Sequence, residues 1–214
     1  MKKLDALAQK TKKVLIALSK LEELRQFTFV GGSALSVYLK HRMSEDLDFF
    51  SWGNELRNEA LLREIKNTFP KGFKIETLNK KQLNLKIEGV KITFFANNWE
   101  ELKNNEKLAG NINIAPIQLL TGMKINSLFL RAKFRDYYDL YVINKEKYTI
   151  ERMYEIIKAY MPEINKKLFQ TALIFTDDIE DDNIDHLKPK YDVNPDQIRN
   201  SFAAQIDNWI KQQR

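Results

Sequence analysis

The sequence predicts an α+β protein in which a mixed β-sheet flanked by helices is followed by a helical region. Up to about Trp99, short runs rich in Phe, Val, Ile and Thr alternate with amphipathic segments. Beyond this residue the pattern is helical. With 214 residues, 43% of them hydrophobic, the chain can bury a sizeable core. We therefore expect two units, residues 1–105 and 106–214.

The individual elements follow from periodicity and from turn residues. Leucines and a valine at three- and four-residue intervals predict a first helix over residues 3–24. The next predicted elements are a strand over 27–30, a helix from Ser33, a strand over 46–52, a helix over 54–68, a strand over 73–78, and a hairpin whose strands, 83–87 and 90–95, flank Glu88-Gly89. The second half predicts helices over 116–130, 133–144, 149–159, 163–175 and 195–212.

The composition narrows the class of protein. Cysteine is absent, which excludes disulfides and thiolate metal sites. No run of 18 apolar residues occurs and the first residues lack the apolar core of a secretion signal, so we expect no membrane span and a cytoplasmic protein. The net charge is +6 although residues 177–185 are strongly acidic, so the remainder is basic. This fits an anionic partner such as a nucleotide or RNA, and fits a merely solvated basic surface equally well.

Two carboxylates stand one residue apart in an apolar run. Asp46 and Asp48 would project to the same side of the predicted strand, while Leu47 and Phe49 face the other side. Carboxylates this close repel each other and resist desolvation unless a cation compensates them. Mg²⁺ prefers carboxylate oxygens together with the phosphate oxygens of a substrate. The pair is a candidate metal site that a nucleotide completes; the alternative is a solvated turn or a salt bridge.

A glycine pair precedes this strand. Gly31 and Gly32, between a strand and a helix, allow the backbone to approach a ligand without an intervening Cβ atom. A helix beginning at Ser33 offers free amide groups and a positive dipole end to a phosphate. If this helix packs beside the strand of Asp46 and Asp48, amides and acids converge. A plain tight turn is the alternative interpretation.

At "GGSAL" followed by "HRMSEDLDFF" the sequence resembles the AbiEii/AbiGii nucleotidyltransferase-like toxins, a family of the DNA polymerase β-type nucleotidyltransferase superfamily. The superfamily pattern is Gly-Ser, about ten residues, then Asp-x-Asp; here twelve residues separate Ser33 from Asp46. The segments "MKINSLFLRAKFRDYYDLYVI", 123–143, and "ALIFTDDIEDD", 172–182, are similar to later elements of the family. The resemblance therefore spans most of the chain.

The resemblance implies a nucleotidyltransferase-like lobe, a helical C-terminal lobe, and transfer of a nucleotidyl group from an NTP to an acceptor hydroxyl. It implies two Mg²⁺ ions held by Asp46 and Asp48, an RNA acceptor with tRNA as the first expectation, and an antitoxin encoded nearby. The catalytic residues implied are Asp46, Asp48, Lys124 and Asp136. Contacts to the nucleotide or the acceptor would come from Gly31, Gly32, Ser33, Arg42, Arg131, Lys133 and Arg135.

One departure from the superfamily pattern concerns a third carboxylate from a later strand. The corresponding strand here offers Lys91 and Thr93 instead of an acid. Glu76 and Glu88 are nearby in sequence, and Asp136 is a further candidate from the second half. Without a third acid, the enzyme activates its acceptor differently, or the chain binds nucleotide without turnover.

The motif of the second half has an alternative of its own. Asp136 and Asp139 are three residues apart on a predicted helix and share a face, with basic residues adjacent, and a surface lattice of ion pairs gives the same pattern. Three functions therefore remain: a toxin that transfers nucleotides, a catalytically inactive nucleotide-binding module, and an RNA-binding or interaction protein whose carboxylates are structural.

Overall fold

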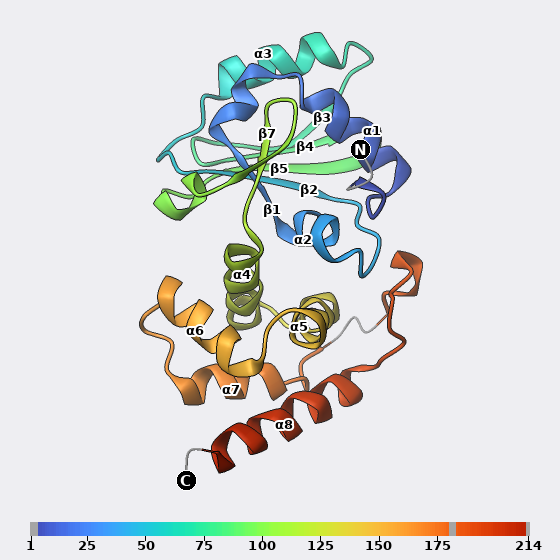
Figure 1. The fold of residues 1–214 in the computed structure, drawn as a ribbon. Helices are drawn as coiled ribbons and strands as arrows, with labels where there is room; N and C mark the ends of the chain where they lie inside the picture. The colour runs from blue at the N-terminus through green and yellow to red at the C-terminus, as the bar shows by residue number, and fades with distance from the viewer. Residues whose placement is uncertain (1–3, 180–182, 213–214) are drawn as a thin grey trace. The chain divides into compact units, whose positions relative to one another are not determined.

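The computed structural model describes residues 4–179 and 183–212. The chain divides into two compact units, Met1–Ile117 (unit 1) and Gln118–Arg214 (unit 2). Unit 1 holds a mixed sheet with helices and unit 2 is helical, which confirms the predicted fold class (Figure 1). The boundary lies beyond the expected residue 105, because residues 106–114 form two strands that join the sheet of unit 1.

Within the described residues, unit 1 is built on a seven-stranded sheet of order β3-β4-β5-β2-β1-β7-β6. The strands are β1 Thr28–Val30, β2 Leu47–Ser51, β3 Lys74–Leu78, β4 Gln82–Ile87, β5 Val90–Ala96, β6 Glu106–Ala109 and β7 Ile112–Ile114. Strand β1 is antiparallel to β2 and parallel to β7, and β2 is parallel to β5. The two short strands β1 and β2 therefore form the middle of the sheet.

Burial alternates along β2, β4 and β5 because successive side chains point to opposite faces, whereas all three residues of β1 are buried. On β2, Leu47 and Phe49 are buried, whereas Asp48 and Phe50 are partly exposed. The buried face carries an aromatic cluster formed by Phe27, Phe29, Phe49 and Phe94. The rings of Phe49 and Phe94 stack with 5.3 Å between their centroids. This cluster fixes which face of β2 points inward, and hence where Asp48 points.

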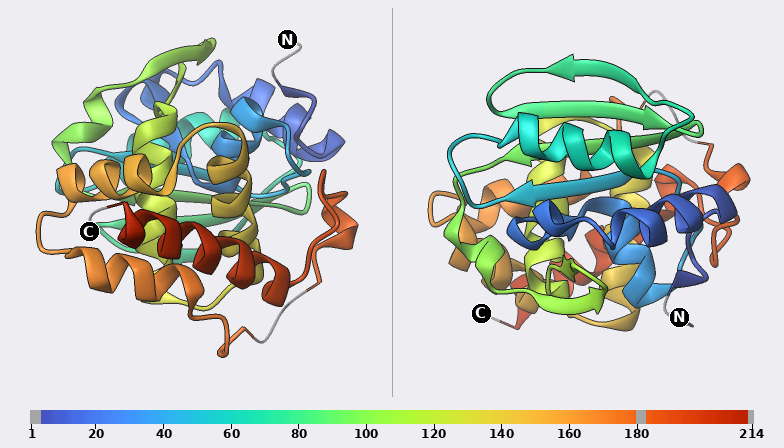
Figure 2. Two further views of the ribbon diagram at one scale, coloured as in Figure 1. Left: turned by 60° about the horizontal axis from the view of Figure 1, so that its bottom comes forward. Right: turned by 90° about the horizontal axis from the view of Figure 1, so that it is seen from above.

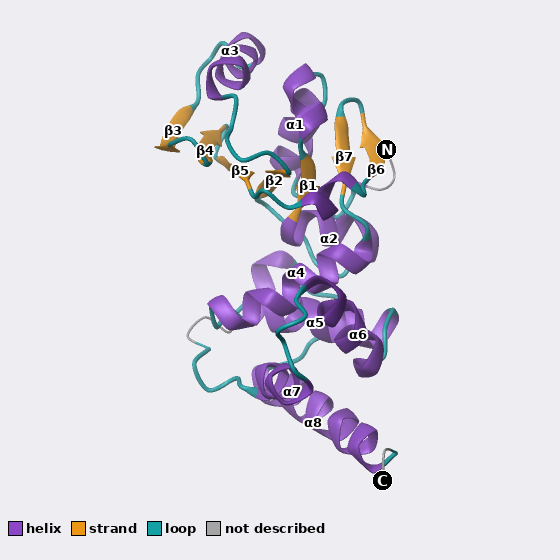
Figure 3. Cartoon of the chain, turned by 90° about the vertical axis from the view of Figure 1, so that its left-hand side faces the viewer, coloured by secondary structure: helices purple, strands orange, loops and turns teal. Residues whose placement is uncertain are grey.

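Among the described residues of unit 1, three α-helices pack on the two faces of the sheet. They are α1 Gln9–Leu18, α2 Gly31–Leu39 and α3 Asn58–Thr68. Figures 1 and 3 show α1 and α3 on one face and α2 on the other, and the right panel of Figure 2 looks onto α1 and α3. Helix α2 packs on β1 and β2. The strands β5, β4 and β3 continue the sheet beyond α2.

The first helix is shorter than the predicted span of residues 3–24. Helix α1 ends at Leu18, and a separate 3₁₀ helix, η2, covers Glu22–Gln26. Beyond α1, the carbonyl of Ser19 accepts a hydrogen bond of 2.6 Å from the backbone N–H of Asn111, in the turn between β6 and β7. The periodicity of the sequence around Ser19 cannot predict a hydrogen bond to a residue so far along the chain. Residues 1–3 lie outside the described residues.

Strands β6 and β7 were not predicted from the sequence. They form an antiparallel pair around Gly110 and Asn111, and Gly110 has φ = +51°. The sequence signal that could have identified them is this Gly-Asn pair between two short runs, which is typical of a hairpin turn.

The hairpin predicted around Glu88-Gly89 is confirmed. Ile87 pairs with Val90, so the loop has two residues, and both of them have positive φ, 52° and 87°. This is the conformation of a type I′ turn, whose twist matches that of the flanking strands. The turn fixes the register of β4 against β5 along their whole length.

The described α-helices of unit 2 are α4 Ile117–Leu130, α5 Phe134–Glu146, α6 Ile150–Tyr160, α7 Lys166–Ile174 and α8 Pro195–Lys211. Helix α4 begins at the last residue of unit 1. Two further 3₁₀ helices are η3 Glu100–Lys103, in unit 1, and η4 Asp185–Leu187, in unit 2. Helix α8 packs on α5, α6 and α7 (Figure 2, left). Its start carries a capping box, in which Asn194 and Gln197 each satisfy the other's backbone N–H. Most of these helices start or end within a few residues of the predicted limits.

Candidate functional site

The paired acids lie at the beginning of β2. Asp48 is the second residue of the strand and Asp46 immediately precedes it. Both are partly exposed, whereas Leu47 between them is fully buried. This alternation agrees with the prediction that the two acids share one side while their apolar neighbours enter the core.

The glycine pair lies in the first turn of α2, two residues earlier than the predicted helix start. Gly31 has φ = +75°, and a Cβ atom there would lie 2.4 Å from Oδ2 of Asp48. Only glycine allows this approach, because any Cβ atom would overlap the carboxylate. The start of α2 and the carboxylate of Asp48 therefore lie close together, and α2 packs beside the strand of Asp48, which is the condition the sequence analysis set for a convergence of amides and acids.

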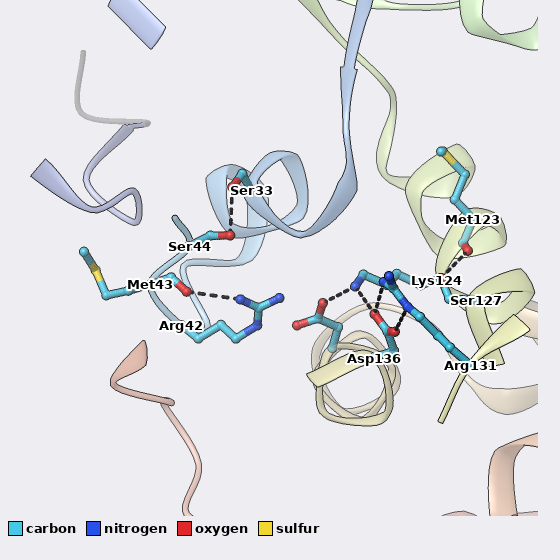
Figure 4. A network of polar contacts seen from close by, with 10 residues as sticks. Ser33, Arg42, Met43, Ser44, Met123, Lys124, Ser127, Arg131 and Asp136 are labelled. Carbon is cyan, nitrogen blue, oxygen red and sulfur yellow. Dashed lines mark hydrogen bonds and ion pairs between the residues drawn. The ribbon is translucent and has the colours of Figure 1, made fainter. Parts of the chain in front are cut away.

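The hydroxyl of Ser33 has a structural role in this arrangement. It is buried and hydrogen-bonds to the backbone carbonyl of Asp46 and, at 2.7 Å, to the hydroxyl of Ser44 (Figure 4). These bonds tie the loop that carries Asp46 to α2. A ligand at this site would therefore meet the backbone N–H of Ser33, while the hydroxyl is engaged within the protein.

The start of α2 combines donors for an anion with acceptors for a cation. The N-cap residue, Val30, makes no side-chain hydrogen bond to the helix, and the first N–H groups of a helix have no partner within the helix itself. The positive end of the helix dipole and these amides favour an anion, and the adjacent carboxylates favour a cation. A phosphate group that carries a divalent cation satisfies both requirements at once.

A row of polar residues extends from Asp48 across strands β5, β4 and β3. Asp48 pairs with Thr93 on β5, Thr93 pairs with Asn84 on β4, and Asn84 pairs with Thr77 on β3. The amide of Asn84 donates to the hydroxyl of Thr77 over 3.4 Å. Thr93 thus occupies the position directly beside Asp48 where the resemblance implies a third carboxylate.

The other proposed sources of a third acid lie elsewhere in unit 1. Glu88 is in the turn between β4 and β5, and Glu76 lies in an irregularity of β3, two strands away from β5. Among the residues that the structure describes, no group of three or more His, Cys, Asp or Glu side chains is arranged as a ligand set. The donor set here is the pair Asp46 and Asp48.

The basic and acidic residues of the second-half motif form a buried network in unit 2. Nζ of Lys124, on α4, lies 2.6 Å from Oδ1 of Asp136 and 2.7 Å from Oδ2 of Asp139, both on α5 (Figure 4). The guanidinium of Arg131 makes a bidentate contact with Asp136, Nε donating to Oδ2 over 2.8 Å and Nη2 to Oδ1 over 3.3 Å. The two aspartates are fully buried. This arrangement differs from a surface lattice, because Lys124 joins two helices from the inside.

The network determines the charge state of Asp136. Burial, the largest influence on this carboxyl, raises its pKa, but the charges and hydrogen bonds of Lys124 and Arg131 together outweigh burial and hold the pKa below its usual 3.8. Both oxygens of Asp136 are engaged by these cations. Its contacts therefore favour a role in positioning Lys124 and Arg131 over ligation of a metal.

The remaining basic candidates differ in their surroundings. Lys133 is exposed at the start of α5 and Arg135 is partly exposed in its first turn, and neither forms an ion pair with a described residue. Arg42, in the loop of unit 1 between α2 and β2, donates to the carbonyl of Met43 over 3.1 Å. The candidate residues thus form two clusters, one at Asp48 in unit 1 and one at Lys124 in unit 2. Of the acidic run 177–185, residues 180–182 lie outside the described residues.

Comparison with known proteins bears on both clusters. An uncharacterized protein of Aquifex aeolicus, aq_aa25, is 23% identical over 203 residues, covering 91% of this chain and 95% of that protein. A putative nucleotidyltransferase from H. pylori has a similar structure, with a TM-score of 0.58 and 16% identity over 96% of both chains. MenT4, a nucleotidyltransferase toxin from Mycobacterium tuberculosis, has a TM-score of 0.50 and 14% identity over 94% of this chain and 86% of that one.

These structural neighbours share the fold. Within residues 4–179 and 183–212, no helix is both long and apolar enough to cross a membrane.

The model of the family "Nucleotidyl transferase AbiEii toxin, Type IV TA system" matches residues 13–208, which include the acids, the glycine pair and the Lys124 network. The chain therefore belongs to the AbiEii family of nucleotidyltransferase toxins of type IV toxin–antitoxin systems.

Proposed function

We propose that the protein transfers an NMP group from an NTP to a hydroxyl of an RNA acceptor, with tRNA as the first candidate. The bond between the α-phosphorus and the bridging oxygen breaks, pyrophosphate leaves, and the acceptor oxygen bonds to phosphorus. The observation that supports the proposal is the close approach of Gly31, in the first turn of α2, to the carboxylate of Asp48. We further propose that the protein is the toxin of a pair whose antitoxin is encoded nearby, as the family description indicates.

In this proposal the residues of unit 1 hold the phosphates. The backbone N–H groups of Gly31, Gly32 and Ser33 bind the terminal phosphates, since they lie at the uncapped end of α2. Asp46 and Asp48 would hold two Mg²⁺ ions, whose remaining ligands are phosphate oxygens and water. When bound, the metal supplies charge neutralisation for the attacking and leaving oxygens. The bond from Ser33 to the carbonyl of Asp46 keeps acids and amides in one fixed arrangement.

Lys124 and its neighbours supply positive charge. An ammonium group has three N–H donors, and Asp136 and Asp139 take two of them. We assign the third to a phosphate oxygen of the NTP. Asp136 then acts as a positioning residue for Lys124 and Arg131. Contacts to the nucleotide or to the acceptor backbone are assigned to Arg42, Arg131, Lys133 and Arg135.

A second candidate is a module that binds nucleotide without transferring it. The observation that favours it is Thr93, a neutral side chain beside Asp48 where the resemblance implies an acid. A hydroxyl cannot act as a general base at neutral pH in the way that a carboxylate can. Under the first proposal, the proton of the acceptor hydroxyl passes to solvent water as its oxygen bonds to the α-phosphorus, without help from a third carboxylate.

The test uses the purified protein with Mg²⁺, each labelled NTP in turn and unfractionated tRNA. We expect label to enter the RNA, and we expect Asp46→Asn to reduce incorporation at least about 100-fold, since even outer partners of metal ligands affect activity 10–100-fold. Glu45→Gln is the matched control, because it removes the same charge from an exposed neighbour, and it should retain activity.

Three other results would decide against this proposal. Full incorporation by Asp46→Asn would show that the acids do not hold metal. Clear Mg²⁺-dependent binding of NTP without incorporation would favour the inactive module. Binding of RNA with no binding of NTP would favour an RNA-binding protein whose carboxylates are structural.

A further inference from the structure

Three lysines lie side by side on the sheet of unit 1. Lys74 on β3 pairs with Lys86 on β4, and Lys86 pairs with Lys91 on β5, so the three stand at one level on adjacent strands. All three are exposed. We call these three residues the lysine row. Neighbouring strands are about 4.8 Å apart, so the row extends about 10 Å across the sheet.

The lysine row is unfavourable for folding. Like charges directly opposite each other on neighbouring strands destabilise a sheet. None of the three lysines forms an ion pair with any residue that the structure describes, and the nearby acids Glu76 and Glu88 are not partners. Lysine on an edge strand protects it from aggregation, but this accounts only for Lys74, because β4 and β5 are inner strands.

The row lies on the same face of the sheet as Asp48. Lys91 precedes Thr93 by two residues on β5, and Thr93 is the direct neighbour of Asp48. Because side chains two apart on a strand share a face, Lys91 and Thr93 project together. The same holds for Lys86 and Asn84 on β4. The lysine row therefore runs parallel to the polar row of Asp48, Thr93 and Asn84, one level away.

An aromatic pair lies on the other side of the polar row. Phe50 on β2 and Phe95 on β5 are direct neighbours, with 5.4 Å between ring centroids, and both are partly exposed. They follow Asp48 and Thr93 by two residues and so share their face. The polar row thus lies between a line of cations and a pair of aromatic rings. Proteins that bind single-stranded nucleic acid combine cations along the backbone with aromatic rings on which bases stack.

We propose that this face is the acceptor site, with the lysine row binding the phosphodiester backbone of a single-stranded segment of RNA and Phe50 and Phe95 receiving a base. The inference rests on the proposed function, since it supplies the acceptor of that reaction. An acidic peptide would use the lysines but would leave the aromatic pair unexplained. The phosphates of an NTP gather at the start of α2 and do not account for Lys74, three strands away from Asp48.

The test compares two triple variants of the full chain. The first carries Lys74→Gln, Lys86→Gln and Lys91→Gln. The matched control carries Lys10→Gln, Lys13→Gln and Lys20→Gln, which removes the same charge from exposed lysines on or just after α1, the helix on the opposite face. Binding of unfractionated tRNA is measured at several KCl concentrations. Binding of Mg²⁺·NTP and the thermal unfolding midpoint are measured for every protein.

We expect the row variant to bind tRNA at least 10-fold more weakly than the native protein. Each phosphate contact in a single strand contributes about 0.7 to the slope of log K against log[salt], so the slope should fall by about 2 in magnitude. The control should keep its affinity and slope. The row variant should bind NTP normally and unfold at the same or a higher temperature, because three opposed charges are gone.

Several results would overturn the inference. An equal loss in the control would mean that only net charge matters, and an unchanged slope in the row variant would mean that the lysines touch no phosphate. Loss of NTP binding in the row variant would assign the lysines to the nucleotide. A native protein that binds tRNA through the row, yet neither binds nor incorporates NTP, would overturn the proposed function and the role of this face as an acceptor site, and would leave only the binding of RNA by the lysine row.

Discussion

Gly31 is the residue at which the two halves of the candidate site meet. Its φ of +75° and the 2.4 Å between its would-be Cβ and Oδ2 of Asp48 are two separate reasons for glycine. We expect Gly31→Ala to abolish nucleotide binding, since the new methyl group displaces the Asp48 carboxylate from the helix start. It should also destabilise the fold by about 1–3 kcal/mol because of backbone strain. Calorimetric titration with Mg²⁺·NTP and urea unfolding measure the two effects.

Gly72→Ala separates strain from displacement. Gly72 also has a positive φ, +105°, but no atom lies within 4 Å of a Cβ added there. This variant should lose stability and keep nucleotide binding. If Gly31→Ala bound nucleotide as well as Gly72→Ala does, the contact with Asp48 would have no part in the site.

How much of the site could be predicted differs from residue to residue. The shared orientation of Asp46 and Asp48 follows from the two-residue period of a strand, which is a local property. The partners of Asp136 and Asp139 do not follow from spacing, because spacing shows only that the two acids share a face of α5. That Lys124 lies between them depends on how α4 packs against α5. Likewise, nothing local indicates that the Ser33 hydroxyl is bound by the loop before β2.

At the scale of the element, the two faces of β2 contribute differently to the free energy of unfolding. Phe49 is fully buried and stacks on Phe94, whereas Phe50, next to it, is partly exposed on the face of Asp48. We expect Phe49→Ala to lower the free energy of unfolding by about 3–5 kcal/mol, because it leaves a cavity in the core. Phe50→Ala should cost much less. Urea denaturation monitored by circular dichroism gives both values, and equal losses would contradict the assignment of the faces.

Elements with a strong local signal were predicted well. The type I′ turn at Glu88-Gly89 and the strand of Asp46 and Asp48 depend on neighbouring residues alone, and both were found within a residue or two. Strands β6 and β7 are four and three residues long, and they become strands because β7 pairs with β1, about 85 residues earlier in the chain. Such short segments lack enough periodicity to be distinguished from a loop.

For the molecule as a whole, the buried network makes stability depend on acid. The pKa of Asp136 is lower in the folded protein than its usual 3.8. The stabilisation that results is complete above about pH 4 and is lost as the pH falls through the lowered pKa, because the unfolded chain then binds the proton more readily. We expect the free energy of unfolding, measured by urea denaturation between pH 2.5 and 6, to fall on the acid side of about pH 4.

Arg131→Gln tests the origin of this effect. The Arg131 side chain is half-exposed, 48%, so its replacement should leave the fold intact. With one cation removed, the pKa of Asp136 moves up toward its usual 3.8, so the loss of stability should be smaller in total and should end at a higher pH. Arg152→Gln, which breaks an exposed ion pair with Glu155, is the control and should follow the native curve. Superimposable curves for all three proteins would mean that Asp136 does not govern acid stability.

The fold class was predictable because the change from alternating to helical patterns occurs on the scale of half the chain. The boundary between the units was not, since it depends on the two late strands that join the sheet. The order of the glycine pair and the acids along the chain was enough to predict that they lie near each other. The sequence also predicted that the acids and the Lys124 network belong to different units, but it placed the boundary at residue 105 instead of Ile117.

The two-residue loop at Glu88-Gly89 determines which side chains of β5 share a face with those of β4. Orientation switches at each step along an extended chain, so one inserted residue there would turn β5 over relative to β4. Lys91 and Thr93 would then point into the hydrophobic core, and Ile92 and Phe94 would be exposed to solvent. A change of length at this hairpin would therefore exchange the polar face of β5 with its buried face.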